Sequence, residues 1–391
     1  MHFYTSINNN YFPKARILAK SLKQYRPTDK FSLVLSDEIP TDVDILKEPF
    51  DEIIRVEELG IPVDNLPQWI FIHSVVELCT AVKGQALVRF LEEGSDKVVY
   101  LDPDIAVFDD LKELDDLLNV YDVVLTPHQT IPENNNVDVE NNEICSLQHG
   151  VYNYGFYAVH NTKNGLKYAR WWRDRLLDYC YDDIPRGLFT DQKWGDIVPA
   201  LFDNIYIWKN PACNVSTWNL THRKVTKNIN GKYYTNGYQL QFYHFSGFDS
   251  GAQETMLKLY AKDSPILFEL REWYIKRLAE EEQDKYSVYP CIYNFYDNKE
   301  EIKRSERLLM RNRLDVMNYF KDIDPRVVNQ KKSYYAWYRA EMGASDSDPV
   351  SSECEARIEL NQIYASRSWK LVMKIKRLYH FGRGFFEKRG K

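Results

Sequence analysis

The chain has 391 residues, enough for one large domain with appendages or for two domains. Its 44% hydrophobic and 28% charged residues are ordinary for a folded globular protein, and a formal net charge of −6 argues against a nucleic-acid-binding body. No apolar run approaches the ~20 residues that a membrane-spanning helix requires. Aromatic residues reach 14%, which suits a protein that stacks on sugars or bases, and equally a large core edged with tyrosine.

The cysteines and the first residues bear on the compartment. The 6 cysteines are scattered and none belongs to a C-x-x-C pair, so we expect neither a zinc site nor a disulfide framework. Residues 1–6 indicate a strand and lack the basic and apolar regions of a signal peptide. We therefore expect a cytoplasmic protein with reduced thiols.

Strand and helix signals alternate along the first part of the chain. Strands are expected at 2–6, 31–35, 53–56, 97–101, 123–125, 157–159, 205–208 and 240–244, and helices at 15–22, 69–90 and 165–180. This alternation predicts an α/β fold, with a largely parallel sheet and helices on both faces. Ligands of such sheets bind outside the carboxyl ends of the strands. The polar residues 132–143 predict a mobile loop, and charged helical stretches follow from about residue 255, notably 298–322.

Two carboxylates stand at the end of one apolar strand. In the segment 98–108, Val-Val-Tyr-Leu-Asp-Pro-Asp-Ile-Ala-Val-Phe, the strand delivers Asp102 and Asp104 one residue apart. A hard divalent cation takes oxygen ligands and can bridge a diphosphate to protein carboxylates. There it acts as a Lewis acid and as a template. The alternative is a strand end closed by an Asp-Pro turn.

The last segment, 366–391, carries nine Lys and Arg residues against one Glu, so the rest of the chain is acidic. Apolar and basic residues alternate at helical spacing, and Phe381, Phe385 and Phe386 follow. A basic amphipathic helix with aromatics can lie on an anionic membrane surface, here the inner face of the cell membrane. The alternatives are a helix packed on the body and a disordered basic end.

Together, these segments resemble the retaining glycosyltransferases of the GT-A fold, especially the family 8 type that includes glycogenin and bacterial lipopolysaccharide galactosyltransferases. Over roughly residues 1–250, the resemblance is carried, in the family's order, by Asn8-Asn-Asn-Tyr11 with the helix at 19–22, Asp102-Pro-Asp104, Tyr152-Asn-Tyr-Gly-Phe156 with Asn161, Asp191-Gln192, and His244-Phe-Ser-Gly247. The family usually has aspartates at Asn8 and Asn9, which this chain lacks.

The resemblance implies a GT-A domain with a mixed Rossmann-like sheet, a Mn²⁺ or Mg²⁺ ion, and a nucleotide-sugar donor, with UDP-sugar favoured. Asp102, Asp104 and His244 would hold the metal. Asp191 and Gln192 would be the catalytic pair, beside the reacting carbon. Donor contacts are expected from Thr5, Asn8, Tyr11, Lys83, Asp102, Asn153, Gly247 and Arg223.

One departure concerns the diphosphate. After His-x-x-Gly the family usually supplies a lysine, whereas Phe248-Asp-Ser250 follows here. We expect Arg223 or Lys83 to supply the missing positive charge. The alternative for Arg223 is an arginine of a surface loop.

In a retaining reaction the new bond forms on the face that the diphosphate leaves. Either a protein nucleophile attacks first, or the acceptor attacks on that same face while Asp191 or Gln192 positions the sugar. We favour the second route because no strong nucleophile stands out. The alternative for this segment is a helix start with Thr190 as its N-cap.

Trp218 and His222 are candidate acceptor contacts, whereas Trp171 and Trp172 lie on an amphipathic helix and are expected in the core. We expect a catalytic domain over 1–250, a helical extension over 251–365 and the basic tail over 366–391.

The expected function is sugar transfer to a saccharide or lipid-linked saccharide in bacterial cell-surface polysaccharide or lipopolysaccharide assembly. One alternative is a sugar-phosphate nucleotidyltransferase, which usually carries a Gly-rich phosphate loop where residues 8–10 have no glycine. The other is a non-catalytic carbohydrate-binding protein that keeps the fold.

Overall fold

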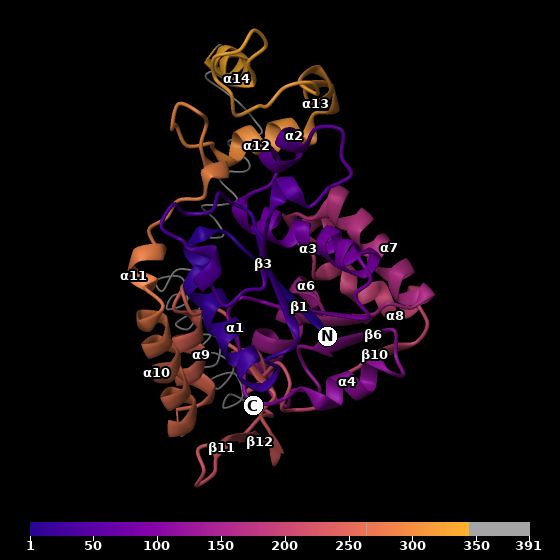
Figure 1. Ribbon diagram of the computed structural model, residues 1–391, viewed down its shortest axis with the longest axis vertical. Coiled ribbons are helices and arrows are strands. Elements are labelled where there is room, and N and C mark those ends of the chain that lie inside the picture. Colours follow the sequence, from indigo (N-terminus) through magenta and orange to yellow (C-terminus); the bar gives the residue numbers. More distant parts are fainter. Residues whose placement is uncertain (263, 344–391) are drawn as a thin grey trace, which may run out of the picture. The chain divides into compact units, whose positions relative to one another are not determined.

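The computed structural model describes residues 1–262 and 264–343 (Figure 1). The described residues divide into two compact units, the first made of Met1–Ile302 and Lys321–Asp324, the second of Lys303–Phe320 and residues 325–343. The basic segment 366–391 lies outside the described residues, so its contact with a membrane stays a prediction, as do the domain boundaries at 250 and 365. No helix of the described residues is long and apolar enough to cross a membrane.

A seven-stranded mixed sheet forms the centre of the first unit. Its strands, in spatial order, are β10 (Ile205–Ile207), β6 (Val123–Pro127), β7 (Tyr152–His160), β4 (Lys97–Leu101), β1 (His2–Ile7), β2 (Lys30–Leu35) and β3 (Glu52–Arg55). Neighbours pair in parallel except β7, which runs antiparallel to both β4 and β6. The predicted α/β class with a largely parallel sheet is confirmed. The antiparallel strand brings its first residues to the edge where β1 and β4 end.

Helices α3 (Val75–Glu92) and α7 (Lys163–Tyr179) cover one face of this sheet, with α2 (Leu66–Phe71) and α8 (Val198–Leu201) beside them. Ser74 and Glu77 form a capping box that starts α3 and thereby sets the position of Lys83 two turns later. Gly84 lets the two long helices approach closely, because a Cβ there would lie 2.7 Å from the Cα of Arg173. The sheet residues that face them include Tyr4, Val98, Tyr100, Tyr157 and Val159.

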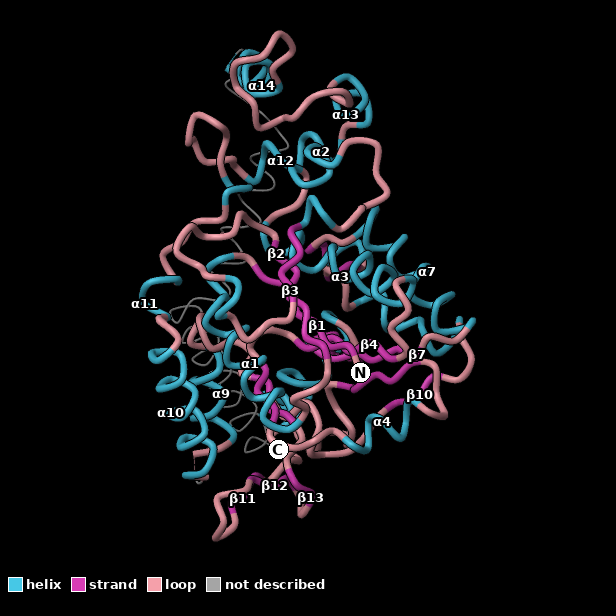
Figure 2. The backbone as a smooth tube through the Cα atoms, in the orientation of Figure 1, coloured by secondary structure: helices cyan, strands magenta, loops and turns pink. Residues whose placement is uncertain are grey.

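The alternate residues of the same strands face α1 (Phe12–Tyr25) and α4 (Lys112–Leu118) on the other side. Phe3, Val99 and Leu101 belong to this second core cluster, as the period of two along a strand requires. Figure 2 shows the strands passing between helices on either side. The predicted helices on both faces are therefore confirmed.

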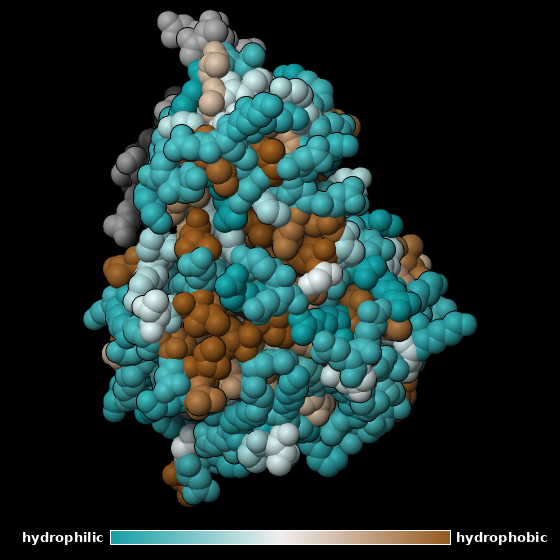
Figure 3. Space-filling view, turned by 45° about the horizontal axis from the view of Figure 1, so that its top comes forward, coloured by the Kyte–Doolittle hydropathy of each residue, from teal (hydrophilic) through white to brown (hydrophobic). Residues whose placement is uncertain are grey.

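Smaller elements complete the first unit. β5 (Ile105–Val107) pairs with β14 (Phe242–His244), β8 (Asp182–Asp183) with β9 (Leu188–Phe189), and β11 (Val225–Lys227), β12 (Tyr233–Thr235) and β13 (Tyr238–Gln239) form a three-stranded sheet. α9 (Ala252–Tyr260) and α10 (Pro265–Glu280) bury a third apolar cluster that includes Tyr243, Phe245 and Tyr274, and α11 (Gln283–Tyr286) follows. On the face that Figure 3 shows, hydrophobic side chains gather in patches among hydrophilic ones.

The second unit contains α12 (Arg304–Asn312), α13 (Leu314–Tyr319) and α14 (Tyr334–Gly343). The charged stretch predicted as helical at 298–322 thus forms two short helices. Phe320 packs edge-on against Tyr334, with ring centroids 5.3 Å apart, and the Tyr334 hydroxyl donates to the carbonyl of Glu306 at 2.7 Å.

The prediction of a mobile loop at 132–143 is wrong in part. Much of this segment is helical, with α5 (Asn136–Asp138), a π-helical turn (Val139–Ile144) and α6 (Cys145–His149) in succession. Asn135 caps α5 by accepting from the backbone N–H groups of Val137 and Asp138. The polar composition reflects this cap and an exposed outer face, neither of which requires disorder.

Trp171 and Trp172 make a matched pair for a test of the core. Trp172 is fully buried, and its indole N–H donates to the carbonyl of Asp191 at 3.2 Å, whereas Trp171 is only partly buried. Trp172→Ala should lower the free energy of unfolding by about 3–5 kcal/mol, and Trp171→Ala by clearly less. Urea denaturation followed by far-ultraviolet circular dichroism measures both. Equal losses would contradict the assignment of Trp172 to the core.

Candidate active site and metal centre

A cavity of about 580 Å³ opens at the edge of the sheet where β1 and β4 end and β7 begins. The expected site residues that line it are Asn8, Tyr11, Lys83, Asp102, Asp104, Asn153, Asp191, Gln192, Trp218, His244 and Gly247. They come from segments far apart in the sequence, and the sheet brings them together. The cavity lies where an α/β sheet binds its ligands.

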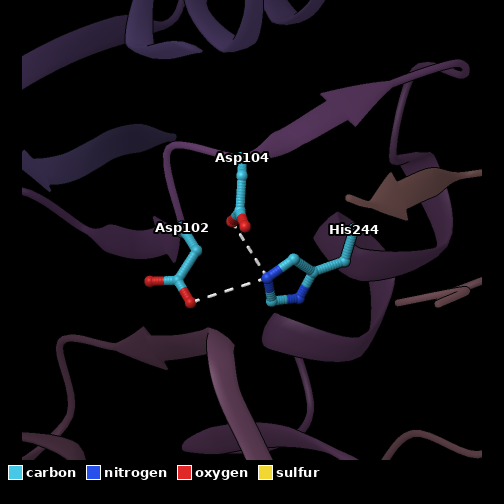
Figure 4. A group of neighbouring side chains, drawn as sticks. All are labelled: Asp102, Asp104 and His244. Atoms are coloured by element: carbon cyan, nitrogen blue, oxygen red, sulfur yellow. Dashed lines mark ion pairs between the residues drawn. The ribbon is translucent and has the colours of Figure 1, made fainter. Parts of the chain in front are cut away.

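Asp102, Asp104 and His244 form a cluster that fits a metal ion, with one ligand atom from each residue within 4.8 Å of the others. The Nε2 atom of His244 lies 3.0 Å from Oδ1 of Asp104 and 3.8 Å from Oδ2 of Asp102 (Figure 4). The pairing of β14 with β5 creates this geometry, because it sets His244 opposite Ile105. The N–H of Phe245 also donates to the carbonyl of Asp104 at 2.8 Å.

The donor set suits a divalent cation, because carboxylates and a neutral imidazole are ligands that manganese accepts. His244 faces the carboxylates with Nε2, while its Nδ1 lies 3.2 Å from the side-chain oxygen of Asn214. Donation from Nδ1–H to Asn214 leaves the Nε2 lone pair free for a metal, an arrangement that commonly orients metal-binding histidines. The Asn214 amide donates in turn to Thr126 and Asn153, which holds it in place.

Asp104 and His244 shift each other's pKa. Burial alone would raise the pKa of Asp104, but His244 outweighs it and holds that pKa below its usual value. Burial alone would lower the pKa of His244, but Asp104 and Asp102 raise it above its ordinary value. The two carboxylates therefore attract a positive charge to the position of the imidazole and the space around it.

Lys83 is buried between two carboxylates. Its Nζ lies 3.2 Å from Oδ1 of Asp102 and 3.0 Å from Oδ2 of Asp191, and the Tyr100 hydroxyl also donates to Oδ1 of Asp102 at 2.7 Å. Burial opposes the charge, but Asp102 and Asp191 outweigh it and raise the pKa of Lys83. The lysine therefore remains an ammonium beside the candidate metal ligands.

Asp191 is 3% exposed and holds a fixed position, since the Thr190 hydroxyl donates to its Oδ1 at 3.1 Å. Burial raises the pKa of Asp191, because Lys83 is shared with Asp102 and only partly offsets the loss of water. Gln192 is also fixed, accepting from the N–H of Tyr154 at 3.1 Å and donating to the carbonyl of His149 at 3.1 Å. The alternative of Thr190 as a helix N-cap is wrong, because Gln192 is the N-cap of the 3-10 helix that follows.

The base loop expected around residues 8–11 contributes Asn8 and Tyr11 to the lining of this cavity. Tyr11 donates to Asp249 at 2.9 Å, and Lys14, which is almost fully buried, pairs with the same carboxylate. Gly247 has a φ of +74°, which favours glycine at this turn. Thr5 is buried in β1 and is not among the residues that line the cavity.

The structure does not bring Arg223 to this cluster. Arg223 is 4% exposed, so the alternative of a surface-loop arginine is wrong. It lines a separate cavity, and its guanidinium donates to the carbonyl of Cys213 at 2.5 Å. His222 lines that second cavity too and lies 3.1 Å from Glu133, whereas Trp218 packs against His128 and His244 in the first cavity.

Several residues of the cluster escape sequence reasoning. Asn214 stands in the sequence only as part of an Asn-x-Ser triplet, and its left-handed φ of +51° is visible only in the fold. Tyr100 reads as one more apolar strand residue before Asp102, and Lys14 as a helix surface lysine. The hydrogen-bond or ion-pair partner of each is the missing signal, and it depends on long-range packing.

Comparisons with known proteins add the following. No family model matches the chain. The uncharacterized proteins YfnF and YfnD of Bacillus subtilis strain 168 are 27% identical over 183 residues and 32% identical over 101 residues. The matched regions cover 44% and 25% of this chain, 57% of YfnF and 32% of YfnD, so the chain spans about half and a third of these relatives.

Among solved structures, this chain is similar to the galactosyltransferase LgtC in complex with donor and acceptor sugar analogues. The matched region covers 74% of this chain and 98% of LgtC, with 16% sequence identity and a TM-score of 0.39. The chain is also similar to mouse xyloside xylosyltransferase 1. Here the matched region covers 63% of this chain and 97% of the mouse protein, with 12% sequence identity and a TM-score of 0.36. Both are glycosyltransferases, the class that the sequence resembles.

Gly155 provides a test of the cluster, because a Cβ there would lie 2.5 Å from Cε1 of His244 and 2.7 Å from Oδ2 of Asp102. Gly155→Ala should displace both side chains and lower the affinity for Mn²⁺ at least about tenfold, as loss of support for metal ligands does. Free Mn²⁺ can be followed by electron paramagnetic resonance. Gly60→Ala is the control, since it strains a positive φ of +68° but contacts nothing within 4 Å. Equal Mn²⁺ affinity of all three proteins would contradict the site.

Proposed function

We propose that the protein is a metal-dependent glycosyltransferase that moves a sugar from a nucleoside diphosphate donor, with UDP-sugar favoured, to a saccharide or lipid-linked saccharide. The observation that carries the proposal is the cavity in which Asp102, Asp104 and His244 meet beside Lys83 and Asp191. A cation held by these ligands, together with the buried ammonium of Lys83, suits a diphosphate, whose oxygens need positive charge beside them.

The residues present fit a divalent ion, Mn²⁺ or Mg²⁺, held by Asp102, Asp104 and the Nε2 atom of His244. When bound, such an ion supplies Lewis-acid stabilisation of the negative charge on the departing diphosphate. Lys83 adds a fixed positive charge to the same region, in place of the lysine that the His-x-x-Gly segment lacks. Asn214 orients His244, and Tyr100 orients Asp102.

Asp191 and Gln192 would position the sugar rather than react with it. Hydrogen bonds hold both side chains in place. Asp191 also forms an ion pair with Lys83, and this ion pair reduces the nucleophilicity of the Asp191 carboxylate. In the proposed retaining route the bond from the anomeric carbon to the phosphate oxygen breaks, and its electron pair leaves with the diphosphate. The acceptor oxygen bonds to that carbon on the same face, and its proton passes to the departing phosphate. A carboxylate nearby stabilises positive charge that develops on the sugar ring.

Two further features support this reading over its rivals. Trp218 lines the cavity with an aromatic surface, as acceptor-sugar stacking requires, and the segment 136–149 contributes Asn141 and His149 to the lining. A sugar-phosphate nucleotidyltransferase would need a glycine-rich loop where Asn8, Asn9 and Asn10 stand. A carbohydrate-binding relic would have no reason to retain a buried lysine between two carboxylates.

Release of nucleotide from a panel of UDP-, GDP- and dTDP-sugars tests the metal requirement. With Mn²⁺ present, one donor should release its nucleotide, and a chelator or Asp104→Ala should lower the rate at least about a hundredfold, about 3 kcal/mol of charge stabilisation. Asp116→Ala, an exposed carboxylate paired with Lys112, is the matched control and should keep the wild-type rate.

Some transferases act only with their acceptor, so donor binding is measured in parallel. If no donor releases its nucleotide and no nucleotide binds in a metal-dependent way, the carbohydrate-binding relic is favoured. Formation of a nucleotide-sugar from a nucleoside triphosphate and a sugar phosphate would favour the nucleotidyltransferase.

The role of Asp191 is tested by Asp191→Asn, which keeps the shape of the side chain and removes its charge. We expect kcat to fall at least about tenfold while donor affinity stays within a factor of about three, because the carboxylate acts on the charged transition state. Asp196→Asn is the control from the same segment, since Asp196 accepts from the N–H of Val151 and does not line the cavity. Full activity of Asp191→Asn would remove Asp191 from the mechanism.

A further inference from the structure

Arg223 is a buried cation without a carboxylate partner in the described part of the chain. The side chain is 4% exposed, yet its hydrogen bond is to a neutral group, the carbonyl of Cys213 at 2.5 Å, and its Nε has no partner. No ion pair links it to an Asp or Glu of residues 1–262 and 264–343. Burial lowers the pKa of Arg223 to about 10, so the guanidinium is still charged at neutral pH.

An unpaired buried charge is costly, and proteins usually compensate it with an opposite charge. Arginine carries several N–H donors in a planar fork that fits phosphate and carboxylate oxygens. With the one bond to Cys213 made, donors remain for another acceptor. Among residues 1–262 and 264–343 no carboxylate takes this place, so an anion from outside these residues fits the remaining donors.

Arg223 lines a cavity of about 420 Å³ that is separate from the donor cavity. Among the described residues that line it, none is Asp or Glu, and the exposed Lys224 adds a second positive charge. His222 lines it as well but is engaged with Glu133 at 3.1 Å. The walls thus carry positive charge and polar groups, Thr221, Asn236 and Ser264 among them.

The same cavity meets the start of α10, a helix of 16 residues. Ser264, its N-cap, makes no side-chain capping hydrogen bond, Pro265 has no N–H, and the N–H of Leu267 donates to the carbonyl of Ser264 at 3.2 Å. Such a helix start carries partial positive charge and binds anions. At the neighbouring end of α9, the carbonyls of Leu257 and Ala261 already accept from Ala261 and Ser264, both at 2.8 Å.

We propose that this cavity is a second binding site, which holds a phosphate group through the Arg223 guanidinium, the Lys224 ammonium and the start of α10. The phosphate is either inorganic phosphate or a phosphate monoester on a saccharide. The segment 217–223 connects the two cavities, since Trp218 lines the first and residues 220–223 line the second. A phosphorylated acceptor is thus one source that could reach both.

Titration of the full chain with inorganic phosphate, in the presence of a chelator and at constant ionic strength, tests the site by calorimetry. Arg223→Met should weaken phosphate binding at least about tenfold, which corresponds to one lost charge-assisted contact. Lys224→Ala, at an exposed position that folding does not require, should weaken it about threefold. Lys232→Ala, an exposed lysine of the next hairpin that does not line the cavity, should leave it unchanged.

A second readout covers the case in which Arg223→Met fails to fold. In protein with ¹⁵N-labelled arginine, phosphate should shift the Nε–H resonance of Arg223, identified by its loss in Arg223→Lys. Glucose 1-phosphate distinguishes the two sources: tighter binding than inorganic phosphate indicates a monoester, and equal binding indicates the free ion.

The proposal is overturned if phosphate does not bind saturably, or if it binds without shifting the Arg223 resonance and without sensitivity to Lys224→Ala. No sugar transfer is needed for this experiment, so its outcome is independent of the proposed activity.

Discussion

The candidate site depends on an excess of negative charge at the end of β4. The carboxylates of Asp102, Asp104 and Asp191 converge on one cavity, and among the described residues that line it Lys83 supplies the one ammonium and His244 an imidazole. With a neutral imidazole, an excess of about two negative charges remains in a region partly shielded from water, which is costly unless a cation compensates it. The divalent ion of the proposed function would supply the charge that closes this balance. Asp102 and Asp104 follow β4, His244 ends β14 and Asp191 follows β9, and the fold brings these three segments to one cavity.

The fold class could be predicted because it depends on local patterns. Apolar runs of strand length alternate with amphipathic helices, and α1, α3 and α7 appear where the spacing of apolar residues indicates them. The helical turns at 136–149 could not be predicted, because their residues are polar and their caps are recognised only once the backbone is known. The orientation of β7 is likewise a property of the assembled sheet, since an antiparallel strand has no sequence signal of its own.

Some residues of the candidate site could also be predicted from the sequence, whereas others could not. Asp102 and Asp104 follow directly from one strand end, and the resemblance carried His244, Asp191 and Gln192 to the same cavity. Arg223 was expected near the diphosphate because only its charge was visible in the sequence, whereas its direction depends on the packing of residues 213–223. The tautomer of His244 is set by Asn214, whose contact spans 30 positions of the chain. Long-range hydrogen bonds of this kind require the fold.

Arg223 and the cluster around His244 illustrate one physical rule with two outcomes. A buried charge that has carboxylate partners, as Lys83 has, organises the site. A buried charge without a carboxylate partner among the described residues, as at Arg223, is the basis for the proposed phosphate site. Asn214 and Cys213, adjacent in sequence, contact the two centres: Asn214 supports His244, and the carbonyl of Cys213 accepts from Arg223. The segment that contains Cys213 and Asn214 therefore supports residues of both cavities.

The most direct test of the central claim is the position of the metal. Crystals grown with Mn²⁺ and UDP would be measured at the manganese absorption edge, where anomalous scattering locates the ion without assumptions about its ligands. We predict one strong peak bound by Asp102, Asp104 and the Nε2 atom of His244, with the diphosphate of UDP completing its coordination. No peak at this cluster in crystals that contain bound UDP, or a peak at other residues, would contradict the account.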